Sequence, residues 1–554
     1  MPAHEEANMS PIHQQAIAAF ENAVIASVAA EPQPNESRES LVSRCLAANG
    51  NMALTIAVKQ EGGEIAWSKA YGIHRNGQAL QPAAEKNPSQ VRIHIPKFCT
   101  NPEMEEEWRE YQLSIREGVL ADAMSDTDES VGVRSKMASV TVNTSFQAAS
   151  IGKPITAIAV LRLVQKGQLN LDADIASYLG RVWKLESKFE LAEPITLRKL
   201  LGHAAGVSGS GFNGYNRNAV RSGKLSLPST IGVLNGEGNS DKVEVVIAPN
   251  LGAVYSGGGT TIVQLVMETV TGKSMQEIIT EELVEPLGLL STSCAFEDIN
   301  QGDFVCGHTG TEGLPLPGGY RIYPETAAAG IWSSALDLCM ISDAVWKSWN
   351  GRLVNGATFL DQSLAIDMLA PRFPDDSKFY YGIGWELKKV GGSDQFRHSG
   401  WNEGFRSGTY TFIDSGAGYS WILSGEVREQ VQAGLDALDV FYKFPIEEKE
   451  TSKKEETAEI PPSALIQCVG EYLPVDSVLK KRDGGVKILV ALSDSDQSAL
   501  VFRFGSISDD IVAKATKDDV FKFDVFKSTA AKFTVTGSGK VKMMFGDLLF
   551  EKSG

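Results

Sequence analysis

An apolar segment in the first third of the chain constrains the fold more than any other feature. From Pro154 to Val164 almost every residue is aliphatic, and the run stops shortly before Gly167. A helix that is apolar on most of its surface is normally surrounded by protein, and a glycine just beyond the last turn is a common end signal. We therefore expect a central helix around which a whole domain is built.

Strand patterns occur both before and after this helix. Residues 52–58 and 64–71 alternate apolar and polar side chains about a Gln-Glu-Gly-Gly turn, which predicts an antiparallel hairpin. Strand signals return at 408–413 and 419–424. Helices bracketed by strands from both chain ends predict an α+β fold, in which N- and C-terminal strands close one antiparallel sheet flanked by helices. Further helices are expected at 261–271, 275–283, 335–348 and 427–440.

The 554 residues exceed what one core usually holds, so we expect at least two domains. The first is residues 1–446, within which the periodic pattern is lost over 77–138, and this indicates an insertion. Its stretch 101–130 carries ten acidic residues against two arginines, which is typical of a solvated surface decoration; a lid over an active site is the alternative. Charged residues 447–462 predict a linker. Period-two alternation within 463–554 predicts a C-terminal all-β barrel domain.

The acidic composition excludes some classes of partner. A formal charge of −17 and a pI near 5.1 disfavour binding to nucleic acid, which is itself densely negative. The six cysteines show no Cys-x-x-Cys pair, so neither a disulfide framework nor a zinc site is predicted, and no other metal or cofactor is expected. No apolar run approaches the roughly 18 residues of a membrane span and no secretory hydrophobic region is present, which predicts a cytoplasmic protein without a membrane partner. The sequence leaves assembly into a homo-oligomer open.

Ser150 and Lys153 immediately precede the central helix and lie three residues apart. At that spacing two side chains share one face of a helix and can touch. A serine hydroxyl is a weak nucleophile until a neighbouring base removes its proton, and a lysine can be that base only when burial or nearby cations lower its pKa. The helix N-terminus also offers N–H donors where negative charge develops on an attacked carbonyl. Alone, a Ser-x-x-Lys pair is a common surface pattern, so the surrounding sequence must show whether this pair is catalytic.

That context resembles the penicillin-recognising serine hydrolases, in particular class C β-lactamases and their esterase relatives. Four segments carry the resemblance, and their order and spacing cover about residues 50–440. The segments are Phe146-Gln-Ala-Ala-Ser150-Ile-Gly-Lys153-Pro154, Ile195-Thr-Leu-Arg-Lys-Leu-Leu-Gly-His203-Ala-Ala-Gly206-Val207, Val254-Tyr255-Ser256-Gly257-Gly258-Gly259, and Tyr381-Gly-Ile-Gly-Trp385 followed by His398-Ser399-Gly400-Trp401. The third segment occupies the place of the family's Tyr-x-Asn motif. The last segment has His-x-Gly where the family has Lys-Thr-Gly.

The resemblance implies a β-lactamase/transpeptidase-like fold and a role for each matching residue. Ser150 would be the nucleophile, and Lys153 and Tyr255 would share proton transfer, the tyrosine either as a tyrosinate base or as a relay to the leaving group. The backbone N–H groups of Ser150 and Trp401 would form the oxyanion hole. Some peptidase-like relatives carry a trailing barrel, which favours a lipocalin-like form for the C-terminal domain. Substrate contacts would come from His398, Ser399, Gly400, Gly257 and Trp332.

Two departures narrow the function that the resemblance implies. Gly257 stands where β-lactamases carry an amide side chain, and His398 stands where they carry a cation for the substrate carboxylate. A second His-x-Gly, at His308, is rejected because loop residues surround it, and His203 is expected to order a loop. We expect hydrolysis of a small ester, amide or peptide through an acyl-Ser150 intermediate, rather than efficient β-lactamase activity. The alternatives are an acyltransferase of secondary metabolism and a catalytically silent binding protein on the same fold.

Overall fold

The computed structural model describes most residues up to 445 and a set of strands beyond them. The predicted insertion at 77–138 and the predicted linker at 447–462 lie outside the described residues. The described ranges are 9–74, 139–187, 191, 193–209, 211–246, 249–250, 253–294, 303–310, 313–316, 318–372, 380–445, 465, 468–474, 488–492, 499–504, 511–515, 520–523, 530–535, 541–545 and 548–552.

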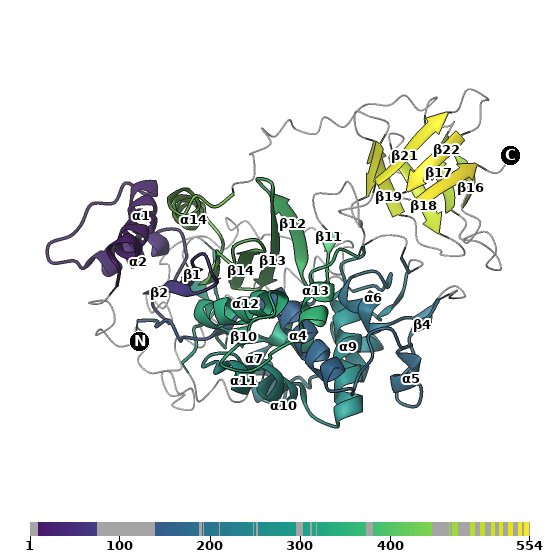
Figure 1. The fold of residues 1–554 in the computed structure, drawn as a ribbon, viewed down its shortest axis with the longest axis horizontal. Helices are drawn as coiled ribbons and strands as arrows, with labels where there is room; N and C mark the ends of the chain where they lie inside the picture. Colours follow the sequence, from purple (N-terminus) through teal and green to yellow (C-terminus); the bar gives the residue numbers. More distant parts are fainter. Residues whose placement is uncertain are drawn as a thin grey trace.

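A seven-stranded antiparallel sheet forms the centre of the larger part of the molecule (Figure 1). Its strands follow the order β11-β12-β13-β14-β15-β1-β2, and Ala53 of β1 pairs with Ser424 of β15. The predicted closure of one sheet by N- and C-terminal strands is therefore confirmed. The strands are β1 (Ala53–Lys59), β2 (Ile65–Gly72), β11 (Tyr380–Tyr381), β12 (Glu386–Val390), β13 (Ser393–Asn402), β14 (Phe405–Phe412) and β15 (Gly418–Ser424).

The β1–β2 hairpin forms where the alternating pattern predicts it. The Gln60 N–H donates to the Glu64 carbonyl at 2.9 Å, and the Gly63 N–H donates back to the Gln60 carbonyl at 3.0 Å. Gly63 has a φ of 83°, and a Cβ there would lie 2.2 Å from Oδ1 of Asp343. The turn therefore requires a glycine at this position both for its backbone angle and for space.

Helices cover both faces of the sheet. On one face α1, α2 and α14 pack against β1 and β15 in a core that includes Leu54, Ile56 and Trp421. On the other face α12 packs against β1, where Ala57 contacts Cys339. Every residue of β1 is buried because protein covers both of its faces. The helices are α1 (Pro11–Ser27), α2 (Arg38–Ala47), α12 (Ala335–Trp349) and α14 (Glu429–Phe441).

The expected central helix is α4 (Gly152–Gln165), which begins two residues earlier than the apolar run. All its residues from Gly152 to Leu161 are buried, and Ile158 is fully inaccessible. The helix ends before Gly167, whose φ of 71° is the left-handed conformation expected of a helix-ending glycine. A 3₁₀ turn, η4 (Ala149–Ile151), leads into the helix and carries Ser150.

The other expected helices are present, with one interruption. The 275–283 region forms α10 (Met275–Ile279) and then a wide π turn, η5 (Thr280–Val284), in which buried Glu282 binds Arg162 of α4 at 3.1 Å. The remaining elements are β3 (Phe146–Gln147), α5 (Ala176–Leu179), β4 (Glu186–Ser187), α6 (Leu197–Leu201), β5 (Tyr215–Asn216), α7 (Arg217–Arg221), α8 (Thr230–Leu234), β6 (Glu244–Val245), α9 (Gly257–Thr271), α11 (Glu285–Leu287), β7 (His308–Thr309), β8 (Leu314–Pro315), β9 (Arg321–Ile322), η7 (Thr326–Gly330), β10 (Trp332–Ser333) and α13 (Gln362–Met368).

Eight strands follow in the C-terminal part, each paired antiparallel with the next, and β16 also pairs with β23 (Figure 1). Tyr472, Phe502 and Met543 are buried among them. A lipocalin-like domain with a boundary near 463 stays a prediction. The strands are β16 (Gly470–Pro474), β17 (Ile488–Leu492), β18 (Ala499–Phe504), β19 (Ile511–Ala515), β20 (Val520–Phe523), β21 (Ala530–Val535), β22 (Val541–Phe545) and β23 (Leu548–Lys552).

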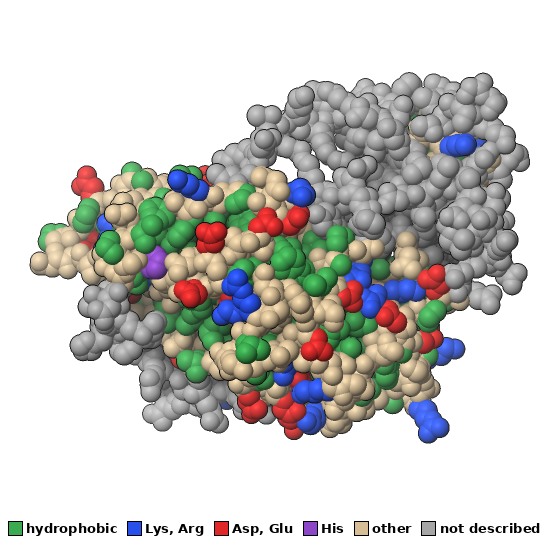
Figure 2. Space-filling model, viewed as in Figure 1, with side chains coloured by type: hydrophobic (Ala, Val, Ile, Leu, Met, Phe, Trp, Pro, Cys, Tyr) green, Lys and Arg blue, Asp and Glu red, His purple; other side chains and the backbone are tan. Residues whose placement is uncertain are grey.

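The surface mixes charges of both signs. Figure 2 shows acidic and basic side chains interspersed over the face in view, rather than gathered into one patch of a single sign. Among the described helices, none combines the length and the hydrophobicity that a membrane crossing requires.

Candidate active site

The structure brings Ser150 and Lys153 together at the start of α4. The Nζ atom of Lys153 lies 3.0 Å from Oγ of Ser150 and also donates to the carbonyl of Ala328 at 3.1 Å. Lys153 is only 3% exposed, whereas Ser150 is partly accessible. The i, i+3 spacing therefore places a buried amine directly beside a reachable hydroxyl.

Burial changes the acid–base behaviour of this amine. Removal from water disfavours the ammonium form and lowers the pKa of Lys153 from 10.5 to about 7, although the negative charge of Glu386 opposes the shift. A large share of the side chain is thus neutral near pH 7. A neutral amine has a lone pair that can accept the Ser150 proton, which an ammonium cannot do.

Tyr255 completes a compact group with these two residues. Nζ of Lys153 lies 4.7 Å from the centre of the Tyr255 ring, and the Ser150 side chain is near enough to the phenol to lower its pKa in part. Burial raises the pKa of Tyr255 well above its usual value. The ring is therefore a phenol at neutral pH, and it can pass a proton but is poorly suited to act as a tyrosinate.

The rings of His203 and Tyr381 pack near the ring of Tyr255. Nδ1 of His203 accepts a hydrogen bond from the Ser256 N–H at 3.2 Å, and its ring lies 4.6 Å from Tyr255 and 4.8 Å from Tyr381, centre to centre. Ser256 caps α9, because its Oγ accepts from the Gly259 N–H at 2.7 Å. The cap and the histidine together fix the backbone that directly follows the tyrosine.

His398 lies on β13, with its ring centre 6.2 Å from that of Tyr255. Its Nδ1 is 2.8 Å from the Ser399 carbonyl, which can only accept, so Nδ1 carries the proton and Nε2 is an acceptor. Nε2 has no hydrogen-bond partner among the described residues. Burial lowers the pKa of His398 to about 4, although Glu386 raises it in part. This position thus offers a neutral acceptor in place of a cation.

Gly400 allows β13 to lie against the turn that carries Ser150. A Cβ at Gly400 would lie 2.4 Å from the Ala148 carbonyl oxygen, so only glycine permits this approach. Ser407 on β14 reinforces the contact by donating to the same carbonyl at 2.8 Å. Ala149, next to Ser150, has a φ of 53°, which is an uncommon backbone state for a residue with a side chain.

The structure describes the surroundings of two residues that were expected to contact substrate. A Cβ at Gly257 would lie 2.7 Å from the Phe212 ring, so Phe212 fills the space that an amide side chain would need. Trp332 is 2% exposed and packs edge-on against Tyr320 with a centroid distance of 4.9 Å. It belongs to the aromatic core rather than to a surface that a substrate can reach. His308, the rejected motif, is buried and hydrogen-bonded to Ser424 at 2.7 Å.

The π turn η7 forms a wall beside this group, since its Ala328 carbonyl accepts from Lys153. Its carbonyls accept from side chains on both neighbouring elements: Ala327 from Thr156 at 3.0 Å, and Ala329 from Nδ2 of Asn402 at 3.0 Å. Asn402 also donates to Oε1 of Gln147 at 2.9 Å. This amide links β13 to the wall, and no motif pointed to it.

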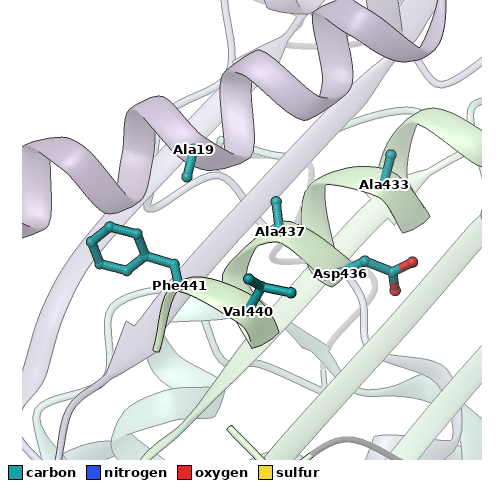
Figure 3. Close-up of a pocket in the computed structure, with 6 residues that line it drawn as sticks. All are labelled: Ala19, Ala433, Asp436, Ala437, Val440 and Phe441. Atoms are coloured by element: carbon teal, nitrogen blue, oxygen red, sulfur yellow. The ribbon is translucent and has the colours of Figure 1, made fainter. Parts of the chain in front are cut away.

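A separate apolar hollow of about 460 Å³ lies between α1 and α14 (Figure 3). The ring of Phe441 and the side chain of Val440 lie on the α14 side and Ala19 on the α1 side. Since it is lined by residues of these two helices, it is distinct from the Ser150 group. Among the described residues, no group of three His, Cys, Asp or Glu side chains is placed to hold a metal ion.

Comparisons with known proteins give the same family. A family model described as Beta-lactamase matches residues 116–439. Penicillin-binding protein 4 of Amycolatopsis lactamdurans is 27% identical over 181 residues, which are 32% of this chain and 44% of that protein. Esterase EstB of Burkholderia gladioli is 28% identical over 241 residues, 37% of this chain and 57% of that protein. The matched regions thus span about half the length of these two relatives.

A solved structure shares the overall fold. The octameric penicillin-binding protein homologue from Pyrococcus abyssi superimposes with a TM-score of 0.51, covering 93% of this chain and 99% of its own. The two sequences are 18% identical, so the likeness concerns the fold alone.

Proposed function

This chain belongs to the β-lactamase family, and on that premise we propose that it is a serine hydrolase working through an acyl-Ser150 intermediate. The observation that carries the proposal is the 3.0 Å contact between Oγ of Ser150 and the buried amine of Lys153. A catalytically silent relative would have no need to keep an amine buried at the cost of its solvation.

In the first step Lys153 acts as the base. Its neutral amine takes the Ser150 proton while Oγ forms a bond to the carbonyl carbon of the substrate, and the carbonyl electrons move onto oxygen. The Ala328 carbonyl accepts one N–H of the amine, which helps to direct the lone pair toward Ser150. The backbone N–H groups of Ser150 and Trp401 are proposed to hold the resulting oxyanion.

In the second step the intermediate collapses. The bond to the leaving group breaks, and the leaving atom receives a proton through the Tyr255 phenol, which is replenished from Lys153. The raised pKa of Tyr255 favours this relay over a tyrosinate base. Water then attacks the acyl-Ser150 carbonyl with the same groups in reverse, releasing the acid and restoring the serine.

We propose small esters, amides or peptides as substrates, rather than β-lactams. A β-lactam carries a carboxylate, and the neutral His398 supplies no positive charge to bind it. Phe212 occupies the space that an amide at position 257 would need to hold an acylamino group. Both differences remove recognition of the antibiotic while leaving the acyl-transfer groups in place.

A fluorophosphonate probe tests the nucleophile. We expect wild type and Ser177→Ala, which changes an exposed serine on α5, to be labelled, and Ser150→Ala to remain unlabelled. Ser150→Ala should also lower kcat/KM for the best ester by at least roughly 10³-fold. Equal labelling of Ser150→Ala would refute the proposal, and nitrocefin as the best substrate would refute the substrate class.

A further inference from the structure

His203 is a buried residue beside the Ser150 group that the proposed mechanism does not use. It is 2% exposed and follows directly after Gly202, which ends α6. Its φ of 57° is a left-handed backbone state that is unfavourable for a residue with a Cβ. Residues in such states persist only where the surrounding structure holds them, and they cluster at functional sites.

Three contacts join His203 to the segment that carries Tyr255. The Val254 N–H donates to the His203 carbonyl at 2.8 Å, and the Ser256 N–H donates to Nδ1 of the His203 ring at 3.2 Å. The His203 ring also packs on the Tyr255 ring, with 4.6 Å between the two centres. One residue therefore contacts the tyrosine and both of its neighbours in the chain.

The Tyr255 segment depends on these contacts because it has no regular secondary structure of its own. Residues 253–256 lie in neither a helix nor a strand, and α9 begins only at Gly257. In a helix or a strand the backbone hydrogen bonds of the element itself would fix such a segment. Here His203 accepts the N–H groups before and after Tyr255, and so sets where the phenol lies.

The His203 ring can accept from Ser256 only as a neutral imidazole. A backbone N–H can only donate, so Nδ1 is the acceptor and Nε2 carries the proton. Burial lowers the pKa of His203 well below its usual value, and the nearby Lys153 and His398 act in the same direction. The acceptor at Nδ1 is therefore kept over the pH range around 7 in which Lys153 titrates.

We propose that His203 is a positioning residue for the leaving-group step, because it holds Tyr255 where its phenol can give a proton to the leaving atom. In that step the bond between the carbonyl carbon and the leaving oxygen breaks, and its electron pair stays on that oxygen. The phenol proton joins the oxygen, and Lys153 then replenishes the phenol. The inference rests on the proposed acyl-enzyme function, and in it His203 acts through Tyr255 alone.

Two esters of one acid test this role, because they differ only in the leaving group. We would measure kcat/KM for methyl phenylacetate by pH-stat titration and for p-nitrophenyl phenylacetate by absorbance, and divide the first value by the second. Methoxide is a strong base that needs a proton to leave, whereas p-nitrophenolate leaves without one. A fault in the Tyr255 relay therefore lowers this ratio, and a general loss of structure lowers both values alike.

His203→Gly should lower the ratio at least about tenfold, as part of the roughly 10²–10⁴-fold that positioned proton transfer supplies. Glycine accepts the left-handed backbone, so this variant removes the ring without adding strain. His203→Asn should retain most of the ratio, because asparagine tolerates the same backbone state and its Oδ1 can accept in place of Nδ1. If His203→Gly does not fold, His203→Leu, which has no acceptor, should show the same fall.

Asn355→Gly serves as the matched control, because it also replaces a left-handed residue by glycine. Asn355 has a φ of 51° and is exposed, and its amide donates to the Pro286 carbonyl at 3.0 Å, outside the site. The ratio in this variant should equal that of wild type.

Tyr255→Phe shows whether His203 acts through the phenol. In this background, which has no phenol to position, His203→Gly should not lower the ratio further. Ser150-dependent hydrolysis with an unchanged ratio in His203→Gly, or with an equal fall in both backgrounds, would overturn this inference alone. If neither ester is hydrolysed in a Ser150-dependent way, the proposed function fails and the inference fails with it.

Discussion

The pH dependence of hydrolysis distinguishes Lys153 from Tyr255 as the base. If the neutral Lys153 amine removes the serine proton, kcat/KM follows the fraction of that amine and rises with pH to a plateau. With a pKa of about 7 in the folded protein, the neutral fraction rises about tenfold between pH 6 and pH 8 and changes little above that. A lysine that kept its ordinary pKa of 10.5 would give about a hundredfold rise with no plateau.

A tyrosinate base would also give about a hundredfold rise, because burial keeps Tyr255 protonated throughout this range. The assay is initial-rate hydrolysis of methyl phenylacetate by pH-stat, at substrate concentrations below KM, with a substrate that does not itself titrate. A plateau near pH 8 supports the lysine. A steady rise through pH 9 would refute the assignment of Lys153 as a base whose pKa is lowered by burial.

Glu386 provides a second test of the same reasoning. Its carboxylate stabilises the Lys153 ammonium, so Glu386→Gln should lower the pKa of Lys153 and move the inflection to lower pH. Glu281→Gln is the control, because this surface carboxylate pairs with Lys273, and its profile should match wild type. A shift to higher pH in Glu386→Gln would contradict the electrostatic account.

Two further predictions concern stability. Buried Lys59 donates to Ser342 and Thr411, and burial lowers its pKa to about 8, so the unfolded chain binds this proton more tightly. Wild type should therefore become more stable as pH rises from about 8 to 10.5, whereas Lys59→Met lacks this titration. The amount by which the unfolding free energy of Lys59→Met exceeds that of wild type, measured by urea titration, should shrink over this range. A difference that stays constant with pH would contradict the prediction. Gly257→Asn should cost about 1–3 kcal/mol by collision with Phe212, and Phe212→Ala should remove most of that cost in a double-mutant cycle followed by thermal unfolding. Simple additivity would refute the contact.

Local patterns in the sequence predicted the elements that depend on local geometry. The apolar run gave α4, the alternating stretches gave the β1–β2 hairpin, and the i, i+3 spacing placed Lys153 against Ser150. Each of these depends on residues that are neighbours along one helix or one turn. Periodicity alone therefore contains enough information to locate them.

Such local patterns did not predict the contacts between segments that are distant in the sequence. Phe212 and Asn402 come from parts of the chain far from Ser150, and Glu386 acts on Lys153 of α4 from strand β12. A motif gives the position of a residue in the chain but not the face of the fold that its side chain enters: Trp332 was expected at the substrate, and its side chain is buried among aromatic rings. The interruption of the 275–283 helix falls where buried Glu282 pairs with Arg162 of α4, a contact that local periodicity does not reveal.

The pairing of β1 with β15 has a consequence for synthesis of the protein. Ala53 leaves the ribosome early, but its partner Ser424 is made only after most of the β-lactamase-family region. Until then β1 exposes an unpaired edge and the apolar face formed by Leu54, Ile56 and Val58, a state prone to wrong association. The sheet can therefore close only after β15 has been synthesised. The yield of folded protein in cells should depend on chaperones that shield the β1–β2 hairpin until then.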